Sequence, residues 1–419
     1  MSKVNTYVNY CENIESSAWA QFMDAMKQDF VVKGALMPDA HTGYSLPIGA
    51  VVACRDYVVP AYVGFDIGCG MSAQKLAGVT KQNIINNADA IFKNIYKRVP
   101  VGFNRFKPGE ALFEQMPTNL SEQLPYTSVI ADLMDLGLHQ LGTLGGGNHF
   151  IEIGFDGDDD VWIVIHSGSR GFGHKVASHY MKIANTDVKE FAAEFDERNA
   201  DLIKHRPDKV AKLRDQYIQK RIAKATAKDG HKGFAADSKI GQDYFTDARF
   251  AQEFALENRK QMIESVSKAI DESCPEAPKM VQHNEHLINR NHNHVVTRDI
   301  DGELLYVHRK GATHAEEGMS GVIPGNMRDG SFIVKGKGNP DALYSSSHGA
   351  GRVLGRKAAK RELNMDDFKE QMTEVKALVT KDTLDESPSA YKDIFEVMRL
   401  QEDLVEVLHH IKPLINIKG

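Results

Sequence analysis

The sequence predicts an α+β fold, because stretches with helical periodicity alternate with short apolar stretches that glycine and proline interrupt. With 419 residues, 42% of them hydrophobic and 26% charged, the chain can bury a sizeable core in one large domain or in two to three average ones. The first helix, over 16–30, should end at Gly34. The other helical stretches are 82–97, 174–222, 243–270 and 366–378, and the strand-like ones are 35–73, 161–165 and 331–334.

Charge and cysteine usage narrow the class of protein. A net charge of −6 argues against a protein that coats nucleic acid non-specifically, although a local basic groove is compatible with it. The chain lacks a basic start followed by an apolar run, and its four cysteines are widely spread, so neither a secretory signal nor a disulfide framework is predicted. No apolar stretch approaches the ~18 residues needed to cross a bilayer. We therefore expect a soluble protein of the reducing cytoplasm.

Two turns in the segment 35–73 carry reactive side chains. Met37-Pro38-Asp39-Ala40-His41 places a carboxylate beside an imidazole, and the glycine-rich loop 64–70 presents Asp66 and Cys69 three residues apart. In such a loop both side chains can bind one metal ion, the carboxylate as the hard ligand and the thiolate as the soft one. The alternative is that Cys69 is a small buried residue in a strand turn.

Two further glycine-rich stretches precede or follow predicted strands. In 141–152 three consecutive glycines can form an anion-binding concavity of backbone N–H groups, followed by Asn148, His149 and Glu152. The strand 161–165 delivers His166 at its end, before a loop that contains serine, arginine and glycine. A histidine at that position fits a metal ligand beside a phosphate site, and the alternative is an ordinary strand-to-helix turn.

The middle of the chain combines charged helices with a group of histidines. The lysines and arginines of 174–222 and 243–270 form either a solvated face or part of an RNA groove. The histidines that follow are His283, His286, His292, His294, His308 and His314. Their spacing fits both strand and helix, so the pattern alone does not choose a metal ligand among them.

The stretch Ser345-Ser346-Ser347-His348-Gly349-Ala350-Gly351-Arg352 supplies a candidate nucleophile. Its small residues let the backbone approach a phosphate while Arg352 offers a forked donor, and His348 stands at the centre. The alternative is a turn whose histidine is merely hydrogen-bonded. Taken with the oxygen, sulfur and nitrogen ligands above, the stretch indicates phosphoryl or nucleotidyl transfer at a two-metal centre.

Several of these motifs together resemble the RtcB family of RNA ligases. The similarity runs in order from about Leu36 to Gly419. It rests on Met-Pro-Asp-Ala-His, Gly-Phe-Asp-Ile-Gly-Cys-Gly-Met, Leu-Gly-Thr-Leu-Gly-Gly-Gly-Asn-His-Phe-Ile-Glu, His-Ser-Gly-Ser-Arg-Gly, Arg-Lys-Gly-Ala, Ile-Pro-Gly-Asn-Met, Ser-His-Gly-Ala-Gly-Arg and Tyr-Lys-Asp-Ile.

The resemblance implies a specific reaction. RtcB enzymes depend on GTP and Mn²⁺ and join an RNA 3′-phosphate or 2′,3′-cyclic phosphate end to a 5′-hydroxyl end. An active-site histidine takes GMP and passes it to the RNA 3′-phosphate, and the 5′-hydroxyl then displaces it. By this resemblance we expect two bound Mn²⁺ ions, a GTP site and an RNA partner.

The resemblance also assigns roles to residues. His348 is expected to be the guanylylated nucleophile, and the expected metal ligands are Asp66, Cys69, His149, His166 and His292. His292 is preferred to His283 because it lies nearer His348 in the sequence. Tyr391 should stack on guanine and Lys418 should bond the base. The other expected nucleotide contacts are Asn148, Glu152, Asn293, Ser345, Ser347, Gly349, Ala350, Gly351 and Arg352.

The chain departs from the family pattern in two motifs. Family members commonly have Pro-Gly-Ser-Met-Gly where this chain has Pro-Gly-Asn-Met-Arg at 324–328, and a cysteine often stands in place of Ser346. These changes concern guanine contacts and the preferred RNA end. The metal ligands and His348 are unaffected.

The expected organisation follows from the same resemblance. We expect one RtcB-like domain over 1–419, with mixed β-sheets around a dinuclear metal cleft, helices outside, and a helical insertion at about 174–272. The protein should act as a cytoplasmic monomer without a membrane partner, and an archease-like activator is compatible with it. Two alternatives are a dinuclear metal-dependent phosphatase or nuclease, and a non-catalytic relative that binds RNA or a nucleotide.

Overall fold

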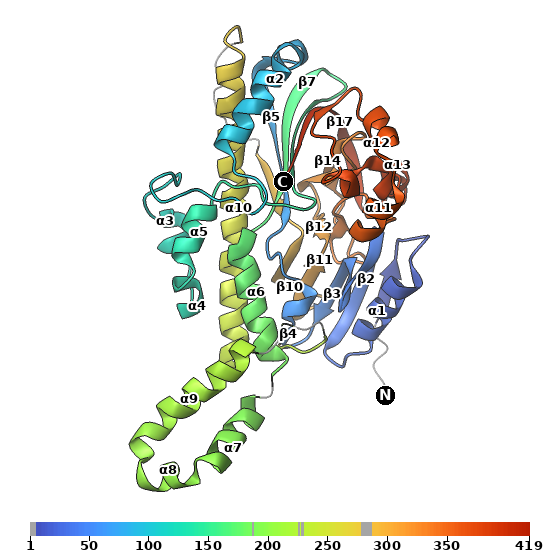
Figure 1. Cartoon of the computed structure of the whole chain (residues 1–419). Coiled ribbons are helices and arrows are strands. Elements are labelled where there is room, and N and C mark those ends of the chain that lie inside the picture. The colour runs from blue at the N-terminus through green and yellow to red at the C-terminus, as the bar shows by residue number, and fades with distance from the viewer. Residues whose placement is uncertain (1–5, 187, 225–226, 228–229, 278–286) are drawn as a thin grey trace.

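The fold is a mixed α/β architecture with β-sheets at its centre and helices outside them, which confirms the predicted class (Figure 1). The computed structural model describes residues 6–186, 188–224, 227, 230–277 and 287–419. Among these residues, no helix has the length and apolar character that spanning a bilayer requires.

The N-terminal sheet combines strands from both halves of the chain. Its order is β1 (Thr6–Asn9), β2 (Val31–Tyr44), β3 (Leu46–Cys54), β11 (Glu303–Lys310) and β10 (Asn293–Ile300). Only the pair formed by β1 and β2 is parallel within this described sheet. The sheet therefore brings residues near position 40 beside residues near position 310.

The helix α1 (Ser16–Met26) covers this sheet and corrects one prediction. It ends at Met26, and Gly34 lies inside β2 instead of terminating the helix. A Cβ atom at Gly34 would lie 2.5 Å from Sδ of Met26 and 3.0 Å from Cζ of Phe22. The glycine is therefore explained by close packing of the helix on the strand.

The larger sheet sets the position of most reactive residues. Its order is β13 (Ser320–Pro324), β14 (Ser331–Gly336), β17 (Val405–Lys418), β6 (Phe150–Phe155), β7 (Asp160–Ser167), β5 (Gly70–Thr80) and β9 (Ile288–Asn291), and β16 (Lys376–Ala377) pairs with β17. The strands predicted at 161–165 and 331–334 are thus confirmed.

The register of this sheet gathers distant segments at one end. Gly70 lies opposite both Ser167 and Asn291, and Phe150 lies opposite His166. The residues next to these positions are Cys69, His292 and His149. Four candidate ligands are therefore neighbours because antiparallel pairing places their strand ends together.

Three helices pack on the larger sheet or beside it. The long helix α10 (Lys239–Ser273) crosses it, with α2 (Lys81–Arg98) and α6 (Arg170–Ala184) alongside (Figure 1). Both α2 and α10 agree with the predicted helices to within a few residues. The buried side of α10 is mostly apolar but also contains polar residues, and Asp247, Asn258 and Arg259 are fully buried there.

The predicted helical region 174–222 is divided into several helices. After α6 the chain forms α7 (Val188–Arg198), α8 (Ala200–His205) and α9 (Pro207–Lys224), which project from the body as an arm (Figure 1).

The remaining elements are short. They are β4 (Tyr57–Val58), α3 (Thr118–Ser121), α4 (Ser128–Ala131), α5 (Met134–Gln140), β8 (Phe234–Ala235), β12 (Ala312–His314), β15 (Ser345–Ser347), α11 (Arg356–Glu362), α12 (Met365–Gln371) and α13 (Ile394–Arg399). The helix predicted over 366–378 is therefore too long, because it ends at Gln371 and the chain then forms β16.

Candidate active site

Two groups of potential metal ligands share one thiol at the end of the larger sheet. One group is Asp66, Cys69 and His149, and the other is Cys69, His166 and His292, with the ligand atoms of each group within 4.8 Å of one another. Sγ of Cys69 lies 3.4 Å from Nε2 of His149 and 3.2 Å from Nε2 of His166. The five residues expected as ligands therefore form one cluster.

Backbone carbonyls set the orientation of two of these imidazoles. Nδ1 of His149 donates to the carbonyl oxygen of Leu144 at 2.9 Å, and Nδ1 of His166 donates to that of Asn148 at 3.2 Å. Each ring then has its lone pair on Nε2, which faces the cluster. A second bond of this kind is typical of histidines that bind a metal.

The cluster has the chemistry of a site for divalent cations. Nε2 of His166 lies 3.3 Å from Nε2 of His292, and two lone pairs at that distance repel each other unless a cation or a proton lies between them. Oδ1 of Asp66 and Nδ1 of His292 have no hydrogen-bond partner among the described residues. Carboxylate, thiolate and imidazole suit Zn²⁺, Mn²⁺, Co²⁺ or Fe²⁺, so the residues present fit two metal ions.

Burial favours the neutral form of two imidazoles and of the thiol in this cluster. It lowers the pKa of both His166 and His292 well below the ordinary value, and the neighbouring imidazoles add to the effect. Burial and the nearby Asp66 carboxylate raise the pKa of the Cys69 thiol. A bound cation would instead lower the pKa of the Cys69 thiol, because a coordinated thiol loses its proton.

A fully buried arginine of α10 supports the loops of the cluster. Nη1 of Arg259 donates to the carbonyl oxygens of Gly68 and Ser167, and Nε and Nη2 donate to the side-chain oxygens of Asn289 and Asn291. These four residues lie one to three positions from Cys69, His166 or His292. Arg259 therefore fixes all three strand ends relative to one another.

His348 lies beside the cluster and contacts a buried carboxylate. Its ring centroid is 4.8 Å from that of His292, and its Nδ1 lies 2.6 Å from Oδ2 of Asp39. The backbone N–H groups of His348 and Gly349 also donate to this oxygen, at 3.2 and 3.3 Å. Burial works against a charge on Asp39, but the facing His348 holds its pKa below the ordinary value.

Close backbone approach positions the His348 loop. Gly351 has a φ of 74°, and a Cβ atom there would lie 2.3 Å from the carbonyl oxygen of Asp39. On the other side of the imidazole, Gly311 has a φ of 63°, and its Cβ would lie 3.0 Å from Cε1 of His348. Both positions therefore require glycine for conformation and for space.

The strand before His348 is held by a second buried arginine. Leu343 and Tyr344 have φ values of 52° and 54°, which are strained for residues with a side chain. Arg309 donates to the carbonyl oxygen of Leu343 at 3.0 Å and to Oγ of Ser345 at 2.8 Å. The strained turn is thus fixed by a residue 36 positions earlier than Ser345.

The other histidines of the middle region have different surroundings. Nε2 of His308 accepts a hydrogen bond from the backbone N–H of Val59, and His294 lies 3.0 Å from Nη1 of Arg309 and stacks on His314. His283 and His286 lie outside the described residues. Of the described histidines in this region, His292 is the one that belongs to a ligand group.

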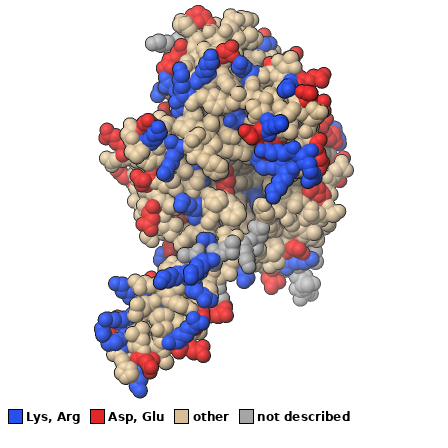
Figure 2. Space-filling model, viewed as in Figure 1, with Lys and Arg blue, Asp and Glu red and all other residues tan. Residues whose placement is uncertain are grey.

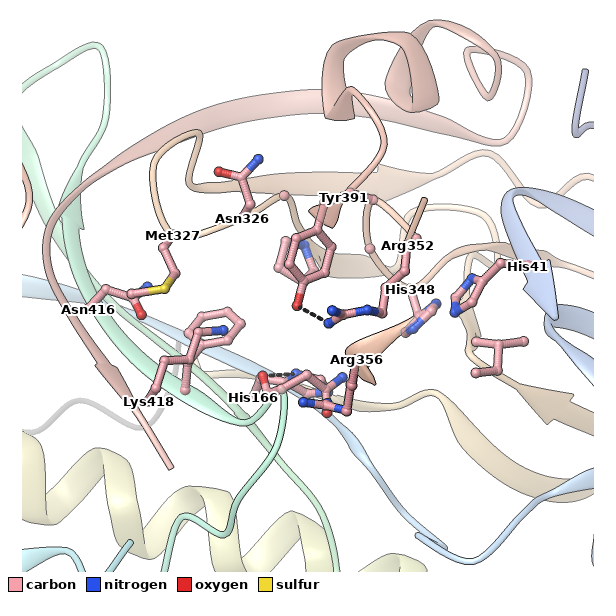
Figure 3. Close-up of a pocket in the computed structure, with 18 residues that line it drawn as sticks. His41, His166, Asn326, Met327, His348, Arg352, Arg356, Tyr391, Asn416 and Lys418 are labelled. Carbon is pink, nitrogen blue, oxygen red and sulfur yellow. Dashed lines mark hydrogen bonds between the residues drawn. The ribbon is translucent and has the colours of Figure 1, made fainter. Parts of the chain in front are cut away.

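A cavity of about 250 Å³ opens beside His348 (Figure 3). His41 and His348 lie at one end, Asn416, Met327 and Lys418 lie at the other, and His166 lies between them. Among the expected nucleotide contacts, its lining includes Asn148, Gly349, Ala350, Gly351, Arg352, Tyr391 and Lys418. Glu152, Asn293, Ser345 and Ser347 are not part of the lining.

Glu152 and Asn293, which lie outside the lining, form hydrogen bonds that support the residues around the cavity. Glu152 accepts hydrogen bonds from Ser331 at 3.0 Å and Asn416 at 3.3 Å, and burial raises its pKa to about 8. The Asn293 side chain donates to the carbonyl oxygen of Asp66 and accepts from the backbone N–H of Gly311.

A buried glutamate organises the far end of the cavity. Glu386 accepts from Tyr391 at 2.5 Å, Lys418 at 3.0 Å, Arg352 at 3.2 Å and Arg356 at 2.8 Å. Burial opposes the charge of Glu386, but Lys418 and Arg356 hold its pKa below the ordinary value. Burial and Glu386 raise the pKa of Tyr391, so its hydroxyl remains a donor.

A family comparison identifies the chain from its sequence. The family model described as tRNA-splicing ligase RtcB matches residues 21–419. The chain belongs to the RtcB family. The resemblance read from the motifs is therefore confirmed, and the match begins 15 residues before Leu36.

RtcB relatives from all three domains of life are similar to this chain over most of its length. RNA-splicing ligase RtcB of Escherichia coli K12 is 34% identical over 421 aligned residues, which cover 97% of this chain and 95% of that protein. The tRNA-splicing ligase RtcB of Pyrobaculum aerophilum is 27% identical, with 95% and 94% covered. RNA-splicing ligase RtcB homolog 1 of Entamoeba dispar is 26% identical, with 93% and 79% covered.

Several residues of this RtcB site were not predicted as site residues, among them Asp39, Arg259 and Glu386. Asp39 stands in a motif noted for its carboxylate, but its partner His348 is 309 positions away. Arg259 lies in a charged helix whose cations were expected mostly in solvent, and Glu386 lies in the short 3₁₀ turn Leu384–Glu386.

Proposed function

We propose that this chain is an RNA ligase that joins an RNA 3′-phosphate or 2′,3′-cyclic phosphate end to a 5′-hydroxyl end, in tRNA splicing or RNA repair. Membership of the RtcB family supports RNA ligation. The observation that carries the proposed chemistry is the 2.6 Å contact between Nδ1 of His348 and Asp39, beside two groups of potential metal ligands.

His348 is the proposed nucleophile. Nδ1 of His348 lies 2.6 Å from Oδ2 of Asp39, and a neutral His348 that carries its proton on Nδ1 has its lone pair on Nε2. Nε2 attacks the α-phosphorus of GTP, an N–P bond forms, the bond from that phosphorus to the bridging oxygen breaks, and pyrophosphate leaves. Asp39 stabilises the positive charge that the imidazole acquires during the attack.

The GMP group then activates the RNA. An oxygen of the RNA 3′-phosphate attacks the phosphorus of the GMP, which restores the free imidazole. The RNA 5′-hydroxyl next attacks the activated 3′-phosphate, loses its proton, and releases GMP as the phosphodiester forms. A cyclic phosphate end must first be opened by water, because the transfer requires a free phosphate oxygen.

Two Mn²⁺ ions and GTP are the proposed cofactors. Asp66, Cys69 and His149 would hold one ion, and Cys69, His166 and His292 the other, with the Cys69 thiolate shared between them. Ions at these positions would neutralise negative charge on the phosphates. The protein itself contributes the fixed orientation of the ligands and a water-poor surrounding.

The proposed nucleotide site is the cavity beside His348. Tyr391 would stack on guanine, and Lys418, at the end remote from His348, would donate to it, because both side chains line the cavity. The loop Gly349–Arg352 and Asn148 would face the ribose and phosphates. We assign Glu152, Asn293, Ser345 and Ser347 the indirect role of holding these walls.

The organisation that accompanies this function is also a proposal. Residues 1–419 would form one RtcB ligase unit with a helical insertion at about 174–272, acting as a monomer in the cytoplasm. An archease-like activator would be compatible with this unit.

Incubation with α-labelled GTP, Mn²⁺ and RNA with the stated ends tests the function. We expect acid-labile label on the wild-type protein and a joined RNA product, and we expect His348→Ala to lose both. GTP-independent hydrolysis that survives His348→Ala would instead indicate a dinuclear phosphatase or nuclease. Binding of RNA without label or product in a metal-loaded sample would indicate a non-catalytic relative.

A further inference from the structure

In the projecting arm, α7 and α9 pack against each other through buried apolar residues and through salt bridges from two arginines. Phe195 of α7 and Val210 and Ile222 of α9 are buried. Arg214 of α9 pairs with Asp196 of α7 at 2.5 Å, and Arg221 pairs with Glu194 of α7 at 3.3 Å. One face of α9 is therefore committed to packing against α7.

The lysines of α9 are placed differently from its arginines. Lys209, Lys212, Lys220 and Lys224 are exposed, and within the described chain none of them forms a salt bridge. At 100° per residue they lie within a stripe about 120° wide and about 22 Å long. We call these four residues the α9 lysine stripe.

The arm also differs in charge from the whole chain. Residues 188–224 contain ten lysines and arginines against seven aspartates and glutamates, whereas the whole chain has a net charge of −6. Figure 2 shows lysine and arginine gathered on the arm and also beside the hollow of the body, at the position of α11. Arg356 of α11 lines the proposed nucleotide cavity. Both basic surfaces therefore appear on one face of the molecule.

We propose that the α9 lysine stripe binds the phosphate backbone of the RNA substrate at a distance from the ends that are joined. This inference rests on the proposed RNA ligase function. Unpaired ammonium groups along one helix face suit sequence-independent contacts with phosphates. The pocket then holds the reacting ends while the arm holds the body of the same RNA.

The composition of α9 favours RNA over a lipid surface. A helix that lies on a membrane exposes an apolar face beside its basic one. The apolar residues Val210 and Ile222 of α9 are instead buried, and Leu213 is a single exposed apolar side chain, which does not make an apolar face. Phosphates along a nucleic acid chain therefore fit the stripe better than a bilayer does.

The test compares a charge-removing and a charge-preserving variant of the full chain. In the first, Lys209, Lys212, Lys220 and Lys224 are each replaced by glutamine, and in the second each is replaced by arginine. A third variant carries Lys93→Gln, Lys97→Gln and Lys268→Gln in α2 and α10, outside the arm. The measurements are GMP labelling, affinity for a structured RNA across salt concentrations, and joining of that RNA and of short oligonucleotides that do not reach the arm.

We expect the glutamine variant to keep wild-type GMP labelling and to join the short oligonucleotides normally. Its affinity for the structured RNA should depend less on salt, because four phosphate contacts account for roughly a 100-fold loss between about 50 and 200 mM salt. It should also join the structured RNA less efficiently, while the arginine variant and the remote variant behave as wild type.

The outcomes separate this inference from the proposed function. Equal RNA affinity, salt dependence and joining in the wild type and the glutamine variant would overturn the role of the stripe. A selective loss of binding to anionic vesicles or to an acidic protein, with RNA binding intact, would also overturn it and would identify a different occupant. Absence of GMP labelling in the wild type would overturn the proposed function instead.

Discussion

The two ends of the cavity are built by opposite electrostatic means. At the His348 end, backbone carbonyls orient the imidazoles of His149 and His166 so that Nε2 of each faces a group of potential metal ligands. At the far end, Lys418, Arg352 and Arg356 already surround the charged Glu386. The comparison teaches that one end offers ligands to a cation from outside the protein, whereas the other pairs its charges within the protein.

The largest effect should come from the carboxylate behind His348. Asp39→Asn removes the charge that faces Nδ1 and can leave the proton on Nε2, so we expect GMP labelling to slow roughly 10³- to 10⁴-fold. Mn²⁺ affinity should not change, because Asp39 belongs to neither ligand group. Labelling rates and metal titrations check this, with the exposed Asp24→Asn as the control. Equal labelling rates would show that Asp39 does not orient the nucleophile.

The second-largest effect should be on metal affinity and should be confined to the cluster of potential metal ligands. Arg259→Met leaves the carbonyl oxygens of Gly68 and Ser167 without their donor, so the loops that carry the ligands loosen. We expect Mn²⁺ affinity to fall by about 10- to 100-fold. Titration against a competing chelator measures it, and Lys260→Met, at the next position of α10, serves as control. Unchanged affinity in a folded Arg259→Met variant would contradict the support that we assign to this arginine.

A smaller effect should appear at the far end. Glu386→Gln removes the negative charge and one of the two acceptor oxygens that hold Tyr391 and Lys418, so we expect the KM for GTP to rise about 10-fold, or about 1.4 kcal/mol. The Mn²⁺ affinity should stay at the wild-type value, which is the opposite pattern to Arg259→Met. Steady-state labelling at varied GTP checks the KM, with the exposed Glu370→Gln as control. If Glu386→Gln weakened metal binding, the two ends would not be independent.

The smallest effect concerns stability and pH. Burial raises the pKa of Glu152 from 4.5 to about 8, so the folded protein favours the protonated side chain. Its contribution to stability is full below pH 4.5 and is lost as the pH rises through about 8. The unfolding free energy of the wild type, relative to Glu152→Gln, should fall by about 1 kcal/mol between about pH 6 and pH 7. Denaturant titrations at the two pH values measure this difference. If the unfolding free energy did not change, the pKa of Glu152 would not be raised by burial.

How far the sequence predicts the site depends on the distance between partners along the chain. Asp66 and Cys69 share one loop, and His149 and His166 stand at strand ends, so local patterns were enough to mark them as candidates. His292 required a family resemblance, because several histidines near it have equally suitable spacing. The register that places Asn291 opposite Gly70 is what brings His292 to Cys69.

The supporting residues could not be read from local patterns for a physical reason. Arg259 in a helix and Arg309 in a strand look like surface cations, and only the fold surrounds them with oxygens that compensate for burial. The same holds for Gly34, whose role depends on Met26 packing against it. The fold class was expected more from the family resemblance than from the periodicity contained in each segment.

Peptide mapping by mass spectrometry tests the central claim most directly. The protein is incubated with GTP and Mn²⁺, digested without acid, and searched for peptides that carry one GMP. We predict GMP on the peptide that contains His348, bonded to Nε2, and none in Asp39→Asn within the time that saturates the wild type. GMP on another residue, or a saturated His348 in Asp39→Asn at the wild-type rate, would contradict the account.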